Sequence, residues 1–372
     1  MQCDDTGYII FISFPVKTLT LTTQPNKGLS MANEKNNNNN NNNNVEQSTK
    51  SNNLPKVFIH GPPQFSIVLQ PNPSQNFHIL NPSSLPSLHE FISLNPHQAS
   101  SISAILCTTL YPVNADVIRL LPSLRLICAS SAGTNHIDLS ECRRRGIKVT
   151  SAGNLFSEEV ADMAVALLID VSRKISTADR FLRRQVQNQF ATWDFPLGSK
   201  LTGKKIGIVG MGRIGLEVAK RLEAFNCMIS YNSRNKKPLL SYPFYSSVLE
   251  LATNTNVLIL CCDLNDQTKY IVNKEVILAL GKGGIIVNVG RGALIDEKEL
   301  LKCLIEGEIG GAGLDVFENE PNVPKEFFSL DNVVLSPHAA ILTSDTFMSI
   351  CQLVEQNLEA FFSNKPLITP VI

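Results

Sequence analysis

The sequence has no excess of charge of either sign. Its 372 residues include 33 Lys and Arg and 33 Asp and Glu, so the formal net charge is zero. Proteins that attract nucleic acid or an anionic membrane by long-range electrostatics usually carry a basic excess. We therefore expect no nucleic-acid partner and no membrane partner, and a small molecule or another protein as the partner.

Cys-x-x-Cys pairs and long apolar runs are also missing. The nine cysteines include no Cys-x-x-Cys pair, which argues against a zinc site or a redox dithiol and fits a reducing compartment. No apolar run approaches the roughly 18 residues that a membrane-spanning helix needs. The sequence therefore predicts no metal site, no disulfide bonds and a cytoplasmic location.

The N-terminus lacks the basic residues of a secretory signal. Its apolar stretch at residues 8–16 follows Asp4 and Asp5 instead of Lys or Arg, which makes it a poor secretory signal. Residues 17–30 are rich in Thr and include Lys17 and Lys27. A plastid transit peptide is therefore the alternative to a cytoplasmic location.

Residues 1–54 lack any apolar periodicity. They contain nine consecutive asparagines at 36–44, followed by Ser, Thr, Gln and Lys. A polar tract of this kind cannot bury enough apolar surface to offset the loss of chain entropy on folding. We therefore expect residues 1–54 to form a disordered, Asn-rich tail.

Deleting residues 1–50 should leave the melting temperature and the turnover number nearly unchanged. The tail supplies no apolar face to a folded core, so its removal costs no burial. Thermal unfolding and steady-state rates of the shortened and full-length chains test this expectation. A marked loss of either property would show that the tail docks on the folded part.

The rest of the chain can form cores, since 43% of all residues are hydrophobic. From Lys56 onward, short apolar runs alternate with helix-like stretches, a pattern that predicts parallel sheets. The first series predicts strands at 57–59, 67–69, 104–107, 124–129 and 148–150. Helices are expected at 114–121 and 138–145, the second ending at Gly146.

A long helix precedes the second series. Ser157 is its expected N-cap, Glu158 and Glu159 suit its first turn, and its apolar spacing continues to Ile175. Strands are then expected at 205–210, 228–231, 257–262, 285–289, 313–317 and 333–335. A last helix at 343–362 has no strand after it and is expected to pack on the first unit.

These patterns predict an α/β fold with two doubly wound parallel-sheet domains of the Rossmann type. The first, a substrate-binding domain, is expected at 55–153 and is completed by 342–372. The second, a dinucleotide-binding domain, is expected at 154–341. In such sheets the carboxyl ends of the strands meet at one crevice, where ligands bind.

A glycine motif predicts the cofactor class. An expected strand runs directly into Gly-x-Gly-x-x-Gly, and an amphipathic helix follows it. The glycines of this combination let the backbone approach a dinucleotide pyrophosphate closely, and the helix N-terminus points free N–H groups at it. The cofactor contacts expected in the turn are Gly210, Met211, Gly212, Arg213, Ile214 and Gly215.

The end of the next strand favours NADP(H) over NAD(H). An NAD site places an acid there to bind the ribose hydroxyls, but this chain has the neutral Asn232, then Ser233 and Arg234, and lysines at 236 and 237. Hydroxyl and cationic groups suit a 2′-phosphate. We expect Ser233, Arg234 and Asn235 to contact it. A basic turn that only faces solvent is the alternative.

Three polar residues follow later strands, at Arg291, Glu320 and His338, which are 29 and 18 residues apart. With their surrounding segments, they resemble the D-isomer-specific 2-hydroxyacid dehydrogenases over about residues 56–370. The sequence is most similar to the plant glyoxylate/hydroxypyruvate and hydroxyphenylpyruvate reductases of that family. The resemblance rests on segments 233–234, 315–321 and 336–340.

The resemblance implies a role for each of these residues. His338 would give a proton to the substrate ketone, Glu320 would hold that histidine, and Arg291 would bind the 2-oxo acid. Backbone N–H groups around Ala132 and Gly133 would bind the substrate carboxylate. Further cofactor contacts are implied for Val289, Asp315, His338 and Ala340.

The implied function is reduction of glyoxylate, hydroxypyruvate or hydroxyphenylpyruvate by NADPH, and the sequence does not choose among these acids. A dinucleotide-sensing protein of the corepressor kind and a phosphoglycerate dehydrogenase are the alternatives. We also expect a homodimer through the helix at 160–175 and the arm that carries Trp193. In relatives this arm crosses a dimer interface.

Overall fold

The structure is a computed structural model that describes residues 54–61, 76–80, 88–109, 111–184 and 195–372. Its contacts divide the chain into Met1–Lys50 and Ser51–Ile372, and all described residues belong to the second unit. The N-terminal tail, the strand expected at 67–69 and Trp193 lie outside the described residues.

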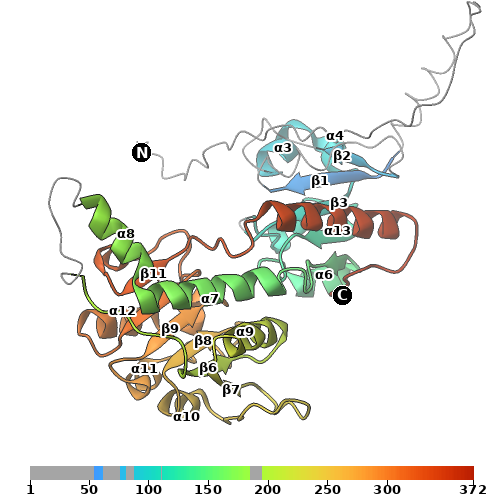
Figure 1. Cartoon of the computed structure of the whole chain (residues 1–372). Coiled ribbons are helices and arrows are strands. Elements are labelled where there is room, and N and C mark those ends of the chain that lie inside the picture. Colours follow the sequence, from blue (N-terminus) through green and yellow to red (C-terminus); the bar gives the residue numbers. More distant parts are fainter. Residues whose placement is uncertain (1–53, 62–75, 81–87, 110, 185–194) are drawn as a thin grey trace, which may run out of the picture. The chain divides into compact units, whose positions relative to one another are not determined.

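The first sheet is entirely parallel, with the strand order β2-β1-β3-β4-β5 (Figure 1). Its strands are β1 (Lys56–His60), β2 (His78–Leu80), β3 (Ile102–Cys107), β4 (Leu126–Ala129) and β5 (Lys148–Thr150). Its helices are α3 (Leu88–Leu94), α4 (Pro96–Ala99), α5 (Ala115–Arg119) and α6 (Leu139–Arg145). Side-chain caps at Asn114 and Asp138 start the last two helices.

The second sheet is also parallel, in the order β11-β10-β9-β8-β6-β7. Its strands are β6 (Lys205–Val209), β7 (Met228–Asn232), β8 (Val257–Leu260), β9 (Ile285–Asn288), β10 (Gly311–Leu314) and β11 (Val333–Leu335). Helices α7 (Ser157–Arg173) and α9 (Arg213–Glu223) share one apolar core with it. A second core holds α10 (Val248–Thr253), α11 (Lys274–Leu280) and α12 (Glu297–Ile305).

The long helix differs from the predicted one at both ends. Its N-cap is Phe156, not Ser157; the Ser157 hydroxyl donates to the carbonyl of Asn154 at 3.0 Å instead. Lys174 adopts a left-handed conformation (φ 57°) that ends α7. Ile175 therefore starts a separate helix, α8 (Ile175–Arg184).

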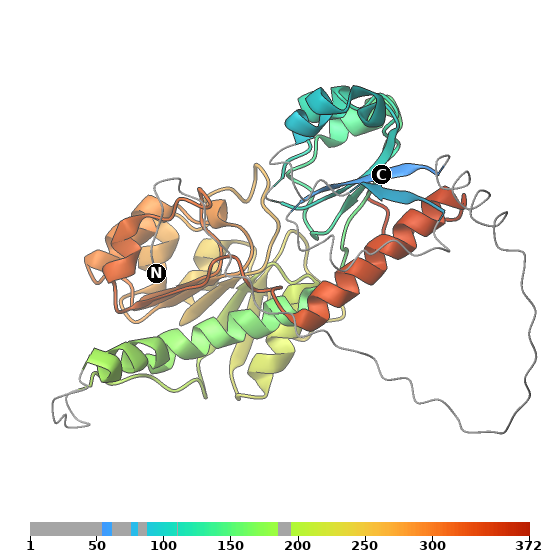
Figure 2. The same cartoon turned by 90° about the horizontal axis from the view of Figure 1, so that it is seen from above.

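The C-terminal segment returns to the first sheet, as expected. Thr343 caps α13 (Ser344–Phe362) by accepting the N–H of Thr346 at 3.1 Å. The helix lies beside the first sheet (Figure 2) and packs on β4. After it, Val371 donates its N–H to the carbonyl of Val149 at 2.8 Å. The predicted fold class, two parallel-sheet α/β domains with the C-terminal helix in the first, is confirmed.

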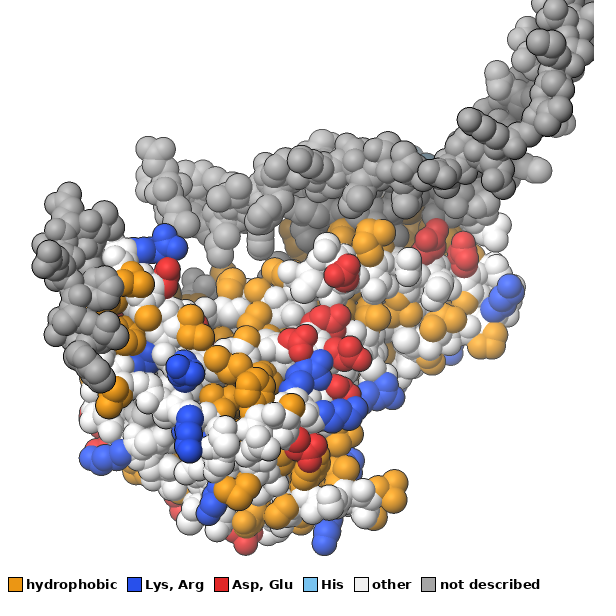
Figure 3. Space-filling model, in the orientation of Figure 1, with side chains coloured by type: hydrophobic (Ala, Val, Ile, Leu, Met, Phe, Trp, Pro, Cys, Tyr) orange, Lys and Arg blue, Asp and Glu red, His pale blue; other side chains and the backbone are white. Residues whose placement is uncertain are grey.

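Acidic and basic side chains lie next to one another on the face shown in Figure 3. Ion pairs of this kind include those of Arg221 in α9 with Asp162 in α7 and with Glu217. Surface pairs of this kind contribute little to stability. Among the described residues, no helix is both long and apolar enough to cross a membrane.

Candidate active site

The strand order places the glycine motif where a ligand is expected. β6 lies between β7 and β8, so the connection from β6 to β7 and the connection from β8 to β9 run in opposite directions along the sheet. Such a switch point opens a crevice at the carboxyl end of the strands. The turn that follows β6 is the Gly210–Gly215 motif, and it leads directly into α9.

Two glycines of this motif, Gly210 and Gly215, leave no room for a side chain. Gly210 has a φ of 98°, and a Cβ there would lie 2.6 Å from the backbone nitrogen of Cys262. A Cβ at Gly215 would overlap the carbonyl of Gly210. At Gly212, by contrast, a Cβ would meet no protein atom within 4 Å. Gly212 is also the N-cap of α9 and has no side-chain cap.

The open space at Gly212 lies beside uncapped N–H groups at a helix N-terminus. Such an arrangement binds phosphate, because the N–H groups and the helix dipole both favour negative charge. The residues present therefore fit the pyrophosphate of a dinucleotide. Met211 is different from its neighbours, since the whole residue is 1% exposed and belongs to the core. Its side chain therefore cannot bind a cofactor.

The turn after β7 holds the residues expected at the 2′-phosphate. Asn232 is buried and donates its side-chain N–H to the carbonyl of Tyr245 at 2.9 Å. The hydroxyl of Ser233 donates to the carbonyl of Asn235 at 2.7 Å. The side chain of Arg234 is exposed. The turn thus offers an exposed cation and no carboxylate between 232 and 237.

Arg291 lies in the loop that follows Asn288, the last residue of β9. Its Nη1 donates to the carbonyl of Gly290 at 2.7 Å, and the side chain of Asn288 donates to the carbonyl of Arg291 at 2.9 Å. The guanidinium is so close to Gly133 that a Cβ there would overlap Nη2. The structure therefore brings the 130–135 loop of the first domain against Arg291.

His338 and Glu320 form a hydrogen-bonded pair. The Nδ1 of His338 lies 2.8 Å from Oε2 of Glu320, and Oε1 of Glu320 accepts the N–H of Phe317 at 3.0 Å. Their side chains are 35% and 29% exposed. His338 has a φ of 56°, and its N–H donates to the carbonyl of Asp315 at 2.7 Å. This bond holds the histidine in a conformation that most side chains avoid.

The environment keeps Glu320 ionised. Burial alone would raise its pKa, but the hydrogen bond and charge of His338, the N–H of Phe317 and the charge of Arg291 together hold the pKa of Glu320 below its usual value. Arg291 is therefore close enough to act electrostatically on the pair. A carboxylate on Nδ1 also leaves Nε2 of His338 for a proton transfer.

The substitution Glu320→Gln should move the pH dependence of turnover to lower pH. The hydrogen bond and charge of His338 lower the pKa of Glu320, so by reciprocity the carboxylate favours the protonated histidine that donates the proton. A neutral partner stabilises imidazolium less than a carboxylate does, so the decline in rate should start at a lower pH than in the parent. Steady-state rates across the pH range measure this. An unchanged profile would show that Glu320 does not support His338.

Asp315 organises the segment that carries His338. The residue is 1% exposed; Oδ1 accepts the hydroxyl of Ser336 at 2.6 Å and the N–H of Ala339 at 2.8 Å. Among the described residues, Oδ2 accepts only the N–H of Ala340, at 3.3 Å. The carboxylate therefore has acceptor capacity left for a cofactor amide while it fixes this segment.

Comparison with known proteins agrees with this geometry. Residues 165–340 match the family model described as "D-isomer specific 2-hydroxyacid dehydrogenase, NAD binding domain". The chain is 51% identical over 324 residues to glyoxylate/hydroxypyruvate reductase HPR3 of Arabidopsis thaliana, covering 87% of this chain and 98% of that protein. It is 45% identical over 287 residues to hydroxyphenylpyruvate reductase of Plectranthus scutellarioides, covering 77% and 90%.

The chain belongs to the D-isomer specific 2-hydroxyacid dehydrogenase family. This confirms the family predicted from the sequence. Among solved structures it resembles the NADPH-dependent glyoxylate/hydroxypyruvate reductase of Sinorhizobium meliloti in complex with NADP and malonate. That comparison has a TM-score of 0.75 and 33% identity, and covers 85% of this chain and 96% of that one.

Two residues of this dehydrogenase's crevice were missed by sequence reasoning. Gly292 packs so tightly that a Cβ would overlap the backbone of Phe317 and Glu318, and its position directly after Arg291 was the available signal. The other is His136, whose Nδ1 is buried and has no hydrogen-bond partner among the described residues. Burial and the charge of Arg291 lower the pKa of His136 to about 4, so it is neutral near pH 7.

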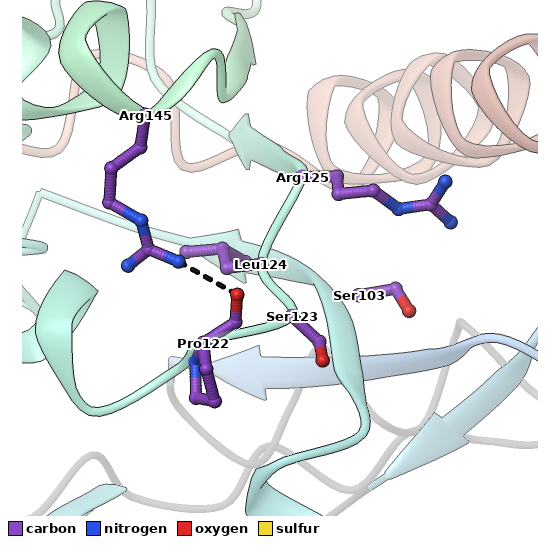
Figure 4. Close-up of a pocket in the computed structure, with 6 residues that line it drawn as sticks. All are labelled: Ser103, Pro122, Ser123, Leu124, Arg125 and Arg145. Carbon is purple, nitrogen blue, oxygen red and sulfur yellow. Dashed lines mark hydrogen bonds between the residues drawn. The ribbon is translucent and has the colours of Figure 1, made fainter.

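A separate hollow of about 540 Å³ in the first domain does not have the chemistry of this dehydrogenase site. It is lined in part by Arg125 and Arg145 (Figure 4). Arg145 donates to the carbonyls of Leu121 and Pro122 at 2.9 and 3.0 Å, and Arg125 lies over the ring of Phe361. Both arginines thus bind groups of the protein around them, Arg145 through backbone carbonyls and Arg125 through an aromatic ring.

Proposed function

We propose that this chain reduces a 2-oxo acid to the 2-hydroxy acid with NADPH. The observation that carries the proposal is the His338–Glu320 hydrogen bond beside Arg291, whose guanidinium lies against Gly133. The proton donor His338, the carboxylate of Glu320 that stabilises it and the guanidinium of Arg291 that binds an anion thus lie together. The relatives named above act on glyoxylate, hydroxypyruvate or hydroxyphenylpyruvate, and these three acids are the proposed substrates.

Each residue of the site has a distinct task in this mechanism. Arg291 and the N–H groups around Ala132 and Gly133 bind the substrate carboxylate and orient the ketone. NADPH, when bound, supplies the hydride. The Nε2–H of His338 gives its proton to the ketone oxygen as the alcohol forms, and Glu320 stabilises the imidazolium beforehand.

NADPH is the proposed cofactor because of two features of the binding crevice. The Gly210–Gly215 turn has open space and uncapped N–H groups for a pyrophosphate. The turn at 233–237 replaces the usual acid with Arg234 and neighbouring lysines. The structural relative from Sinorhizobium meliloti is in complex with NADP. Contacts of Val289 and Ala340 with the cofactor belong to the same proposal.

A steady-state comparison tests the proposed function. The full chain is assayed with glyoxylate, hydroxypyruvate and hydroxyphenylpyruvate, each with NADPH and with NADH. We expect NADPH consumption that depends on at least one of the acids and yields an equal amount of hydroxy acid. Tight NADPH binding without turnover of any 2-oxo acid would contradict the proposal and favour a dinucleotide-sensing protein.

We also propose a homodimer, through a surface that shares Ile175 with the expected 160–175 helix and continues along α8. The apolar face of α7 is already covered within the chain by α9 and by β9, β10 and β11. The neighbouring α8 has no buried residue, and exposes Ile175 and Leu182 at 53% and 49%. Exposed apolar side chains on one helix favour association.

Light scattering at micromolar concentration should give the mass of a dimer, and Ile175→Glu combined with Leu182→Glu should shift it toward the monomer. Both residues are exposed, so the folded state should persist. A parent chain that is monomeric would contradict the dimer. A variant that stays dimeric would place the interface elsewhere.

We also propose a cytoplasmic location. All eight described cysteines are free thiols, which fits a reducing compartment. A fluorescent protein fused to the C-terminus of the full chain should distribute through the cytoplasm. Accumulation in plastids would support the transit-peptide alternative.

A further inference from the structure

The turn that carries Glu320 is fixed on one side by Gly292. The backbone of Phe317 and Glu318 lies so close to Gly292 that no side chain fits between them. Gly292 directly follows Arg291, and Glu320 is two residues beyond Glu318. The positions of the anion-binding arginine and of the histidine's carboxylate partner therefore depend on the same backbone contact.

The other side of the turn is held by two polar side chains that the mechanism does not use. Oε2 of Glu297, the first residue of α12, accepts the N–H of Glu318 at 3.1 Å. The hydroxyl of Tyr270 donates to Oε1 of Glu318. The N–H of Tyr270 in turn donates to the carbonyl of Ala293 at 2.9 Å. Both the backbone and the side chain of Glu318 are thus tied to the segment around Arg291.

The carboxylates here are close enough to affect one another. Burial and the charges of Glu318 and Glu320 raise the pKa of Glu297, despite the hydrogen bond from Glu318. Bringing like charges together costs free energy. A half-buried acid beside two other acids is therefore an unfavourable choice on electrostatic grounds alone. Its hydrogen bond to the turn is the compensating interaction.

A cap or helix-dipole role does not account for Glu297. Acids are favoured in the first turn of any helix, but Asp296 already caps α12 by accepting the N–H of Glu299 at 3.3 Å. An acid in the first turn can also face solvent, as the exposed Glu275 of α11 does. Glu297 instead points its carboxylate at the backbone of another segment, 21 residues along the chain.

We propose that Glu297 is a positioning residue of the reductase: by holding the N–H of Glu318 it fixes the Phe317–Glu320 turn, and so keeps Glu320 bonded to His338. The inference rests on the proposed function. Glu297 touches neither substrate nor cofactor in this account. It acts only through Glu320, and its loss should reduce turnover without weakening NADPH binding.

The test compares Glu297→Ala with Glu297→Gln, and uses Glu275→Ala as the matched control. Without this hydrogen bond the turn that carries Glu320 is no longer fixed, so Glu297→Ala should lower kcat by about tenfold, which corresponds to about 1.4 kcal/mol. Its KM for NADPH should stay at the parental value. The amide oxygen of Gln accepts the same N–H, so Glu297→Gln should recover most of kcat. Glu275→Ala should behave like the parent.

A second arm adds Glu297→Ala to Glu320→Ala, which removes the contact with His338 altogether. Residues that act through one contact are non-additive, so the double variant should be no slower than Glu320→Ala alone. Additive losses, equal kcat for the Ala and Gln variants, or parental kcat in Glu297→Ala would each overturn the proposal. Thermal unfolding and NADPH binding confirm that each variant is folded.

The parent chain separates this inference from the function on which it rests. If the parent reduces no 2-oxo acid with NADPH, the proposed function has failed. If the parent is active and Glu297→Ala matches it, only the positioning role has failed.

Discussion

His338→Ala should lower the turnover number for 2-oxo acid reduction by about 10²- to 10⁴-fold, the usual contribution of a general acid. His338 is the residue whose Nε2 remains available for proton transfer while Nδ1 is bonded to Glu320 at 2.8 Å. Alanine removes the donor and leaves the ketone oxygen to water. The glycine turn is not altered by the change, so NADPH should bind with nearly parental affinity.

Two measurements check this result. Single-turnover rates with hydroxypyruvate give the loss in the chemical step, and fluorescence titration with NADPH gives the affinity of the variant. The matched control is His97→Ala, because His97 is an exposed histidine on α4 and should have no effect. A His338→Ala variant that reduces 2-oxo acids at the parental rate would show that the active site has been misplaced.

The second large effect is the choice of cofactor. A 2′-phosphate brings nearly two negative charges to the turn at 232–237. This turn contains the exposed Arg234 and no acidic residue. One or two charge-assisted bonds of roughly 1.5–3 kcal/mol give NADPH an advantage over NADH of about 10- to 1000-fold in kcat/KM. Arg234→Ala should remove much of this preference and change kcat/KM for NADH little.

The control for Arg234→Ala is Lys365→Ala, which removes an exposed cation near the C-terminus and should leave the preference intact.

Adding Asn232→Asp would supply an acceptor for the ribose and repel the phosphate. In this structure it would also place a carboxylate against the carbonyl of Tyr245, which Asn232 now binds through its N–H. We therefore expect the added change to favour NADH at some cost in stability. A parent that uses both cofactors equally would show that the 233–237 turn faces away from the ribose.

The fold class could be predicted because it depends on repeated local patterns. Alternating apolar runs and helical stretches predict two parallel sheets, and the chain forms them. The break between α7 and α8 could not be predicted, because the apolar spacing continues across it. Lys174 in a left-handed conformation, and the Asp170 carboxylate that accepts the N–H of Ser176 at 2.8 Å, are local contacts without a distinctive sequence signal.

The positions of the site residues follow from topology, but their interactions do not. Arg291, Glu320 and His338 were predicted to converge because each comes after a strand whose carboxyl end faces the crevice. β10 ends at Leu314 instead of the predicted Phe317, which frees Asp315 to organise the histidine segment. The hydrogen bond from Tyr270 to Glu318 joins residues 48 positions apart. No spacing rule on one sequence shows such a contact.

The configuration of the product tests the central claim most directly. The claim is that this member of the D-isomer specific 2-hydroxyacid dehydrogenase family transfers hydride from NADPH to a 2-oxo acid held by Arg291 and protonated by His338. Hydroxypyruvate is incubated with NADPH and the full chain, and the hydroxy acid formed is resolved by chiral chromatography. We predict the D-isomer in an amount equal to the NADPH consumed. The L-isomer, a racemic product, or consumption of NADPH without any hydroxy acid would contradict the account.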